Sequence, residues 1–152
     1  MKKYIISTIF MMALIFMFSS QSGSVSGGYS DLIVKYLMRF QLISKIFVIN
    51  DNLAFLVRKS AHVFVYFMLG LNTYMLFYKY NQEKNKRFNK LIIVLMSIIF
   101  CLLYAISDEF HQSFVDGRGP SVKDVGIDSI GYIISNLILL KLKNSSHGHI
   151  IT

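Results

Sequence analysis

Histidines and carboxylates occur at a few points of a chain that is otherwise strongly apolar. Such side chains can act as general acids, general bases or hard-metal ligands. The candidate catalytic residues are His62, Asp108, Glu109, His111 and Asp128. A histidine with a carboxylate three residues before it is a common arrangement, so it supports a metal site only weakly. Metal content and cofactors stay undetermined by these residue types.

Cations and neutral polar side chains form a second group, which is suited to holding a phosphate or a carboxylate. Guanidinium and ammonium groups bind such anions through charge-assisted hydrogen bonds. The candidate ligand-binding residues are Arg58, Lys59, Gln21, Gln112, Arg118, Ser121 and Asp124. The sequence holds no H-E-x-x-H, no G-x-S-x-G and no phosphate-loop motif. Whether the protein is an enzyme is therefore left open.

Helical spacing places many of these side chains on shared faces. Residues three or four apart lie on one side of a helix. Three such faces are Arg58 with His62 and Tyr66, Asp108 with His111 and Gln112, and Asp124 with Asp128, Gly131 and Ser135. Small residues let helices approach closely. We predict one polar pocket, in which Arg58 or Arg118 lies beside Asp124 or Asp128, because buried charges need partners.

Four apolar runs must position these groups. The 152 residues are 54% hydrophobic and 16% charged, whereas soluble domains are nearer one quarter charged. The runs are Tyr4–Phe18, Ala61–Tyr78, Leu91–Ile106 and Val125–Leu140. We predict an all-α membrane protein with four short transmembrane helices. About sixteen residues span roughly 24 Å, less than the ~30 Å hydrocarbon core, so flanking polar residues must extend each span. A signal-peptide core is the alternative for the first run.

The basic residues indicate the orientation. Residues 79–90 hold five basic residues and one acidic residue, which is typical of a cytoplasmic loop. We predict a multi-pass protein of the cell membrane with both termini in the cytoplasm. The polar groups then lie at the outer face. The net charge of +8 is explained by this rule and by anionic lipids, so we expect no nucleic-acid partner.

The remaining segments are connections and ends. Charged residues recur every fourth position in residues 31–47, which predicts an amphipathic helix at the outer interface, preceded by a flexible turn at Gly23–Ser30. We predict one domain, residues 1–143, and a flexible cytoplasmic tail, residues 144–152. Cys101 is the only cysteine and cannot form an internal disulfide.

Four ordered motifs resemble those of the VanZ-like family of membrane proteins. They are Phe18–Gly23 with Ser26, Arg58–His62 with Tyr66, Leu69 and Gly70, Ser107–Gln112 with Gly117 and Arg118, and Ser121–Val125 with Asp128 and Gly131. Two positions depart from the family pattern. Asp116 stands where proline is usual, and Ser135 stands where a second glycine is common.

The resemblance implies a bacterial membrane protein of about four spans and, through the founding member, a link to resistance against teicoplanin, a glycopeptide antibiotic. It supplies no reaction. We expect the pocket to bind or modify an anionic lipid headgroup or a lipid-linked cell-wall ligand. A non-enzymatic binding or partner-stabilising protein is the alternative, and a small transporter is the third. The oligomeric state is undetermined.

Overall fold

Helices make up the fold of the described residues. The computed structural model describes residues 1–37 and 51–145, with the side chains of residues 37, 51, 52 and 143–145 left out. The helices are α1 (Lys2–Ser19), α2 (Gly23–Leu37), α4 (Asp51–Glu83), α5 (Lys90–Gln112) and α6 (Val122–Ser145). The predicted all-α class is confirmed. The predicted tail lies outside the described residues from residue 146 onward.

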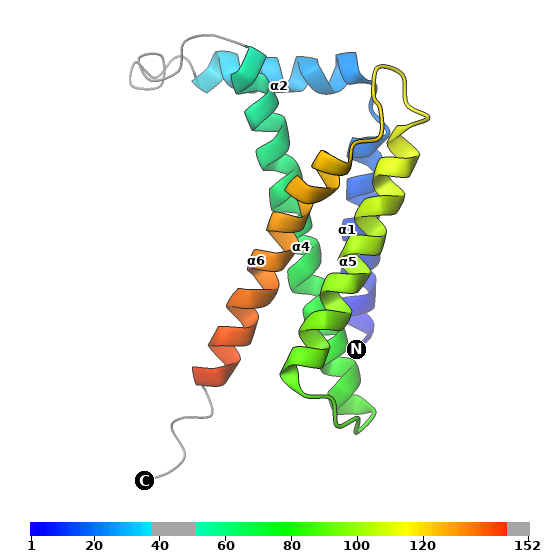
Figure 1. The fold of residues 1–152 in the computed structure, drawn as a ribbon, viewed down its shortest axis with the longest axis vertical. Helices are drawn as coiled ribbons and strands as arrows, with labels where there is room; N and C mark the ends of the chain where they lie inside the picture. The colour runs from blue at the N-terminus through cyan, green and yellow to red at the C-terminus, as the bar shows by residue number, and fades with distance from the viewer. Residues whose placement is uncertain (38–50, 146–152) are drawn as a thin grey trace.

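The four helices α1, α4, α5 and α6 run along one another and are each long and apolar enough to cross a membrane (Figure 1). Their number agrees with the prediction, but α4 is not short. It has 33 residues, or about 50 Å at ~1.5 Å per residue, which exceeds the ~30 Å hydrocarbon core. Arg58 and Lys59 were expected to open this span. They instead lie about two turns inside a helix that begins at Asp51, because polar side chains on one face do not interrupt helical hydrogen bonding.

Helix α2 lies across one end of the bundle, which we call the α2 end (Figure 1). The predicted flexible turn at Gly23–Ser30 is wrong, since these residues form the first two turns of α2. Ser26 and Ser30 are buried, and the Ser30 hydroxyl donates a 3.1 Å hydrogen bond to the Ser26 carbonyl. Burial of this face against α4 thus offsets the low helix propensity of this serine- and glycine-rich stretch. Of the predicted helix 31–47, residues 31–37 are helical and the rest lies outside the described residues.

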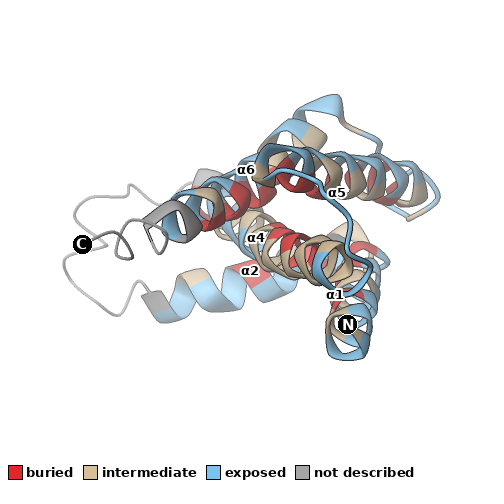
Figure 2. Ribbon diagram, turned by 90° about the horizontal axis from the view of Figure 1, so that it is seen from below, coloured by how far each residue is buried: buried red, intermediate tan, exposed pale blue. Residues whose placement is uncertain are grey.

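Buried residues face inward on α4, α5 and α6, and the outer faces are exposed (Figure 2). Many exposed residues are large and apolar, such as Phe10, Leu103 and Phe110, as expected of a surface that lipid covers. Two apolar clusters fill the interior. The first, nearer the α2 end, comprises Ile15, Tyr66, Leu69, Cys101, Ala105 and Tyr132, and the second comprises Tyr74, Ile93, Val94 and Leu139.

Glycines bring α4 and α6 close together. A Cβ added to Gly131 would clash with the backbone carbonyl of Val63 and lie 2.8 Å from the backbone nitrogen of Phe67. A Cβ on Gly70 would clash with the Ser135 hydroxyl. This contact positions the start of α6, with Asp124 and Asp128, against Lys59 and His62 of α4.

Candidate functional site

A polar cavity of about 190 Å³ opens at the α2 end, between α4 and the loop that joins α5 to α6. Its walls carry basic side chains and glycine backbone. The lining residues are Gly23, Arg58, Lys59, His62, Gln112, Gly117, Arg118, Gly119 and Asp124. Six of the predicted site residues therefore line a single cavity, and only one of the six is acidic.

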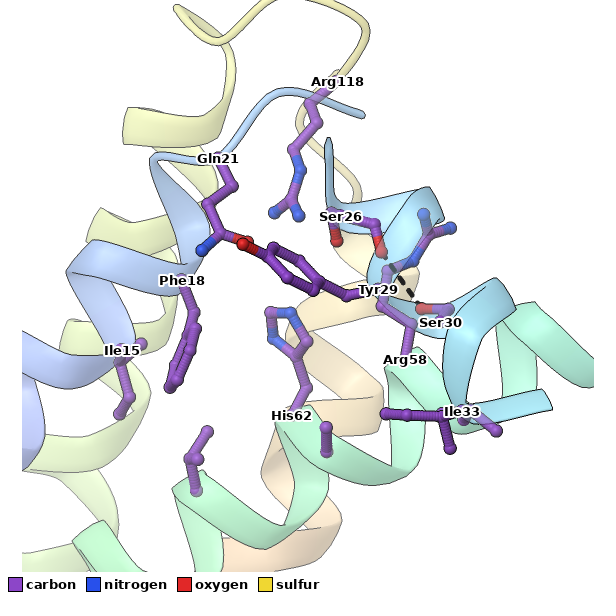
Figure 3. Close-up of a pocket in the computed structure, with 13 residues that line it drawn as sticks. Ile15, Phe18, Gln21, Ser26, Tyr29, Ser30, Ile33, Arg58, His62 and Arg118 are labelled. Carbon is purple, nitrogen blue, oxygen red and sulfur yellow. Dashed lines mark hydrogen bonds between the residues drawn. The ribbon is translucent and has the colours of Figure 1, made fainter. Parts of the chain in front are cut away.

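An apolar cavity of about 340 Å³ adjoins the polar one. Helices α1, α2 and α4 form it, and apolar side chains dominate its wall. Arg58, His62 and Arg118 line both cavities. In Figure 3 the side chains of His62 and Arg118 point toward one another, with Gln21, Phe18 and Ile15 beside them, and the Arg58 guanidinium is turned toward Ser26.

The polar cavity is closed on one side by a loop that touches the start of α2. Gly117 has a positive φ of 72°, which glycine adopts without strain. The backbone N–H of Gly23 donates to the Asp116 carbonyl at 3.0 Å, and a Cβ on Gly23 would lie 2.5 Å from the Gly117 carbonyl oxygen. The loop therefore needs glycine on both sides of this contact. Asp116 contributes through its carbonyl, which any residue could supply.

Arg118 extends from this loop into the site. Its Nη1 donates to Gln112 Oε1 at 3.0 Å and to the Ser19 carbonyl at 3.5 Å. The other guanidinium nitrogens make no hydrogen bond to any residue that the structure describes. Burial, and then the nearby Arg58, lower the pKa of Arg118. An arginine still stays charged at neutral pH.

The charge pairs differ from the predicted ones. Lys59 Nζ lies 2.5 Å from Asp124 Oδ2, whereas we had expected an arginine in this position. Neither Arg58 nor Arg118 forms an ion pair within the described ranges. Arg58 instead lies over the ring of Phe55 at 5.9 Å from its centroid. Its position one residue before Lys59 turns it about 100° around α4, away from Asp124.

His62 of the cavity wall lies beside a buried carboxylate of α6. Its Nδ1 lies 3.7 Å from Asp128 Oδ1, and Asp128 is 2% exposed. The other oxygen, Oδ2, has no hydrogen-bond partner in the part of the chain that the structure describes. Asp128 thus lies behind His62 rather than in the cavity wall.

Two further carboxylates lie beneath the cavity in a network of neutral donors. Asp108 Oδ2 accepts hydrogen bonds from Ser19 Oγ at 2.7 Å, Gln112 Nε2 at 3.1 Å and Tyr66 Oη at 3.4 Å. Glu109 accepts from Gln112 Nε2 at 3.3 Å and from a backbone N–H at 2.9 Å. Gln112 therefore separates these acids from Arg118, to which it presents its carbonyl oxygen.

Five predicted site residues line neither cavity: Asp108, Glu109 and Asp128, described above, and also His111 and Ser121. His111 stacks on Phe16, with ring centroids 4.3 Å apart, and its Nε2 lies 3.1 Å from Ser20 Oγ. The backbone N–H of Ser121 donates to Glu109 Oε2, and its hydroxyl accepts from the Asp124 N–H at 3.3 Å, so Ser121 caps α6. Of the two histidines expected to share one pocket, His62 therefore lines both cavities and His111 lines neither.

Sequence reasoning missed the contribution of α2. Ser26, Tyr29, Ser30 and Ile33 line the apolar cavity, but the serines and glycines around them suggested a turn. The i, i+4 spacing of Ser26 and Ser30 was the signal that could have shown one helical face. No group of histidine, cysteine and acidic side chains in residues 1–37 and 51–145 is arranged to hold a metal ion.

Four apolar helices and a polar cavity at one end define a multi-pass α-helical membrane protein with a basic site. No curated protein and no solved structure matches the chain. Residues 4–143 match the VanZ/LLP1 family, and the chain belongs to that family.

Proposed function

We propose that this protein binds the anionic headgroup of a lipid or lipid-linked cell-wall ligand at the outer face of the cell membrane. The single observation that carries the proposal is the lining of the polar cavity, where Arg58, Lys59 and Arg118 oppose one carboxylate, Asp124, which Lys59 already pairs. The two arginines hold no ion pair among the described residues. A half-enclosed site with unpaired guanidinium groups favours a phosphate or carboxylate ligand.

The buried carboxylates near the polar cavity do not remove its preference for an anionic ligand. Asp108 and Glu109 are bound by neutral donors, and Gln112 lies between them and Arg118. Their negative charge lowers the free energy needed to keep three cations in a partly buried site. A bound anion would replace the missing direct partners of the arginines.

The interior beneath the cavities supports binding over transport. The two apolar clusters follow one another along the bundle, and they contain mainly aliphatic and aromatic residues. A carrier needs a polar path or a second arrangement that opens to the other side. Polar side chains buried beneath the site, such as Thr73, Ser97 and Asn136, bond one another or the helix backbone within this core, which is why we rank the transporter last.

Modification of the bound headgroup is the second candidate function, and the His62–Asp128 pair favours it. A histidine beside a buried carboxylate can act as a general base when the carboxylate orients the imidazole. We expect His62→Asn to abolish hydrolysis of a phosphate-bearing lipid even at saturating substrate, where weaker binding no longer limits the rate. Equal, background-level phosphate release from the wild type and this variant would reject the enzymatic candidate and leave the binding protein.

Binding of a short-chain, water-soluble phosphatidic acid to the purified protein tests the proposed function. We expect Arg118→Gln and Arg58→Gln to weaken binding at least tenfold, which is about 1.4 kcal/mol each. Arg87→Gln is the matched control, because Arg87 lies in the exposed α4–α5 loop at the other end of the bundle. Equal binding by all three variants would contradict a basic headgroup site.

A contribution to glycopeptide resistance is a further expectation that follows from the family. Expression of the protein in a susceptible bacterium should raise the inhibitory concentration of teicoplanin, and Arg118→Gln should abolish the increase at equal protein level. An increase that persists in this variant would separate resistance from the cavity.

A further inference from the structure

We propose that the apolar cavity between α1, α2 and α4 holds the hydrocarbon chain of the same ligand, and that this ligand is a single-chain phosphate monoester. The inference rests on the proposed function, because the phosphate must occupy the polar cavity. What carries it is the junction of the two cavities: Arg58, His62 and Arg118 each line both. A phosphate held by these side chains has the apolar cavity directly beside it.

The polarity of the walls changes in the direction that an amphiphile requires. Gln21 lies two residues beyond the end of α1 and is followed toward the bundle interior by Phe18 and Ile15 of that helix, at successive steps of three residues. Along α4, Arg58 is followed in the same direction by Ala61 and then Val65. Both segments therefore present a polar residue at the headgroup level and apolar residues about one and two turns deeper.

The space exists because small residues face it. Ser26 and Ser30 of α2 and Ala61 of α4 line the cavity, where larger side chains would fill it. The Ser30 hydroxyl is bonded to the Ser26 carbonyl, so it does not need a polar partner from a ligand. Helix α2 thus contributes a wall against which a hydrocarbon chain can pack without leaving that hydroxyl unpaired.

The volume favours one chain. About 340 Å³ equals roughly eleven volumes of ~30 Å³, the share of one water molecule. One chain segment next to the headgroup fits this space. Three cations around the adjoining cavity suit the charge of a phosphate monoester better than that of a carboxylate.

Chain-length dependence tests the proposal. The protein is placed in phosphatidylcholine nanodiscs, and the binding of dodecyl phosphate and butyl phosphate is compared, with empty nanodiscs as the control for partition. We expect dodecyl phosphate to bind at least tenfold more tightly. Ala61→Phe should remove this difference by weakening dodecyl phosphate alone. Ala13→Phe is the matched control, since Ala13 is exposed on α1 and does not line the cavity; Ala61→Val serves if Ala61→Phe does not fold.

Each contrary outcome would reject a different part of the proposal. Equal affinities for the two phosphates, both lowered by Arg118→Gln, would overturn the chain site and leave the headgroup site standing. No binding of either phosphate would overturn both. Tighter binding of didodecanoyl phosphatidic acid than of dodecyl phosphate would overturn the single chain, and equally tight binding of dodecanoate would overturn the phosphate. An effect of Ala13→Phe as large as that of Ala61→Phe would also reject the site.

Discussion

The Lys59 ammonium group lies 2.5 Å from the Asp124 carboxylate and joins the first part of α4 to the first turn of α6. Both side chains are partly buried, at 14% and 26% exposure. The pair therefore fixes the edge of the polar cavity and leaves Arg58 and Arg118 without a carboxylate of their own among the described residues.

Removal of one member of this pair should destabilise the protein. We expect Lys59→Met to reduce the free energy of unfolding by about 1–3 kcal/mol, between the values for exposed and fully buried pairs. Asp124→Asn in the same background should cost less than it does alone. Thermal unfolding of the two single variants and the double variant measures the coupling, and strictly additive losses would show that the pair contributes nothing.

Alanine should have opposite effects at two glycines of α6. Gly131→Ala places a methyl group against the α4 backbone and should lower stability by about 1–3 kcal/mol. Gly126→Ala meets no atom within 4 Å and should raise stability by up to about 1 kcal/mol through helix propensity. Unfolding temperatures in the same detergent check both signs, and a stabilising Gly131→Ala would contradict the close α4–α6 contact.

The two histidines should differ in their effect on binding. His62→Ala removes a side chain that lines both cavities, and we expect it to weaken dodecyl phosphate binding roughly tenfold, or about 1.4 kcal/mol. His111→Ala removes a side chain that contacts Phe16 and Ser20 outside the cavities, so affinity should change less than twofold. If His111→Ala weakened binding more than His62→Ala, the binding site would instead lie on the α1–α5 face.

The membrane orientation can be tested by cysteine labelling. We expect Val122→Cys, at a position 89% exposed at the α2 end, to react with an impermeant maleimide on intact cells. Lys86→Cys, in the α4–α5 loop, should react only after permeabilisation. The native Cys101 is fully buried and provides the unlabelled background. Labelling of Lys86→Cys in intact cells would show that the protein has the opposite orientation in the membrane.

The basic residues of that loop should act in insertion and not in binding. They lie at the end of the bundle away from the cavities (Figure 1). Combined Lys84→Gln, Lys86→Gln and Arg87→Gln should therefore increase the inverted fraction while correctly inserted protein keeps its affinity for dodecyl phosphate. A loss of affinity at normal insertion would assign the loop to the site.

The sequence by itself determined the helical class, the four spans and the end of the bundle at which polar groups meet. Apolar runs of this length have few alternatives, because a backbone in lipid must satisfy its hydrogen bonds within helices. Chain direction then brings the end of α1, the start of α4, the end of α5 and the start of α6 to one level. For the same reason six predicted residues, Arg58 and Arg118 among them, line one cavity.

Only the tertiary structure decided which side chains face one another. Rotation of α4 selected Lys59 over Arg58 as the partner of Asp124, and rotation of α5 turned His111 toward Phe16. One residue along a helix corresponds to about 100° of rotation, so partner choice depends on how helices pack and not on their order. Tertiary packing also determined the conformation of α2. Its serines and glycines favour a turn locally, but packing against the bundle stabilises them as a helix.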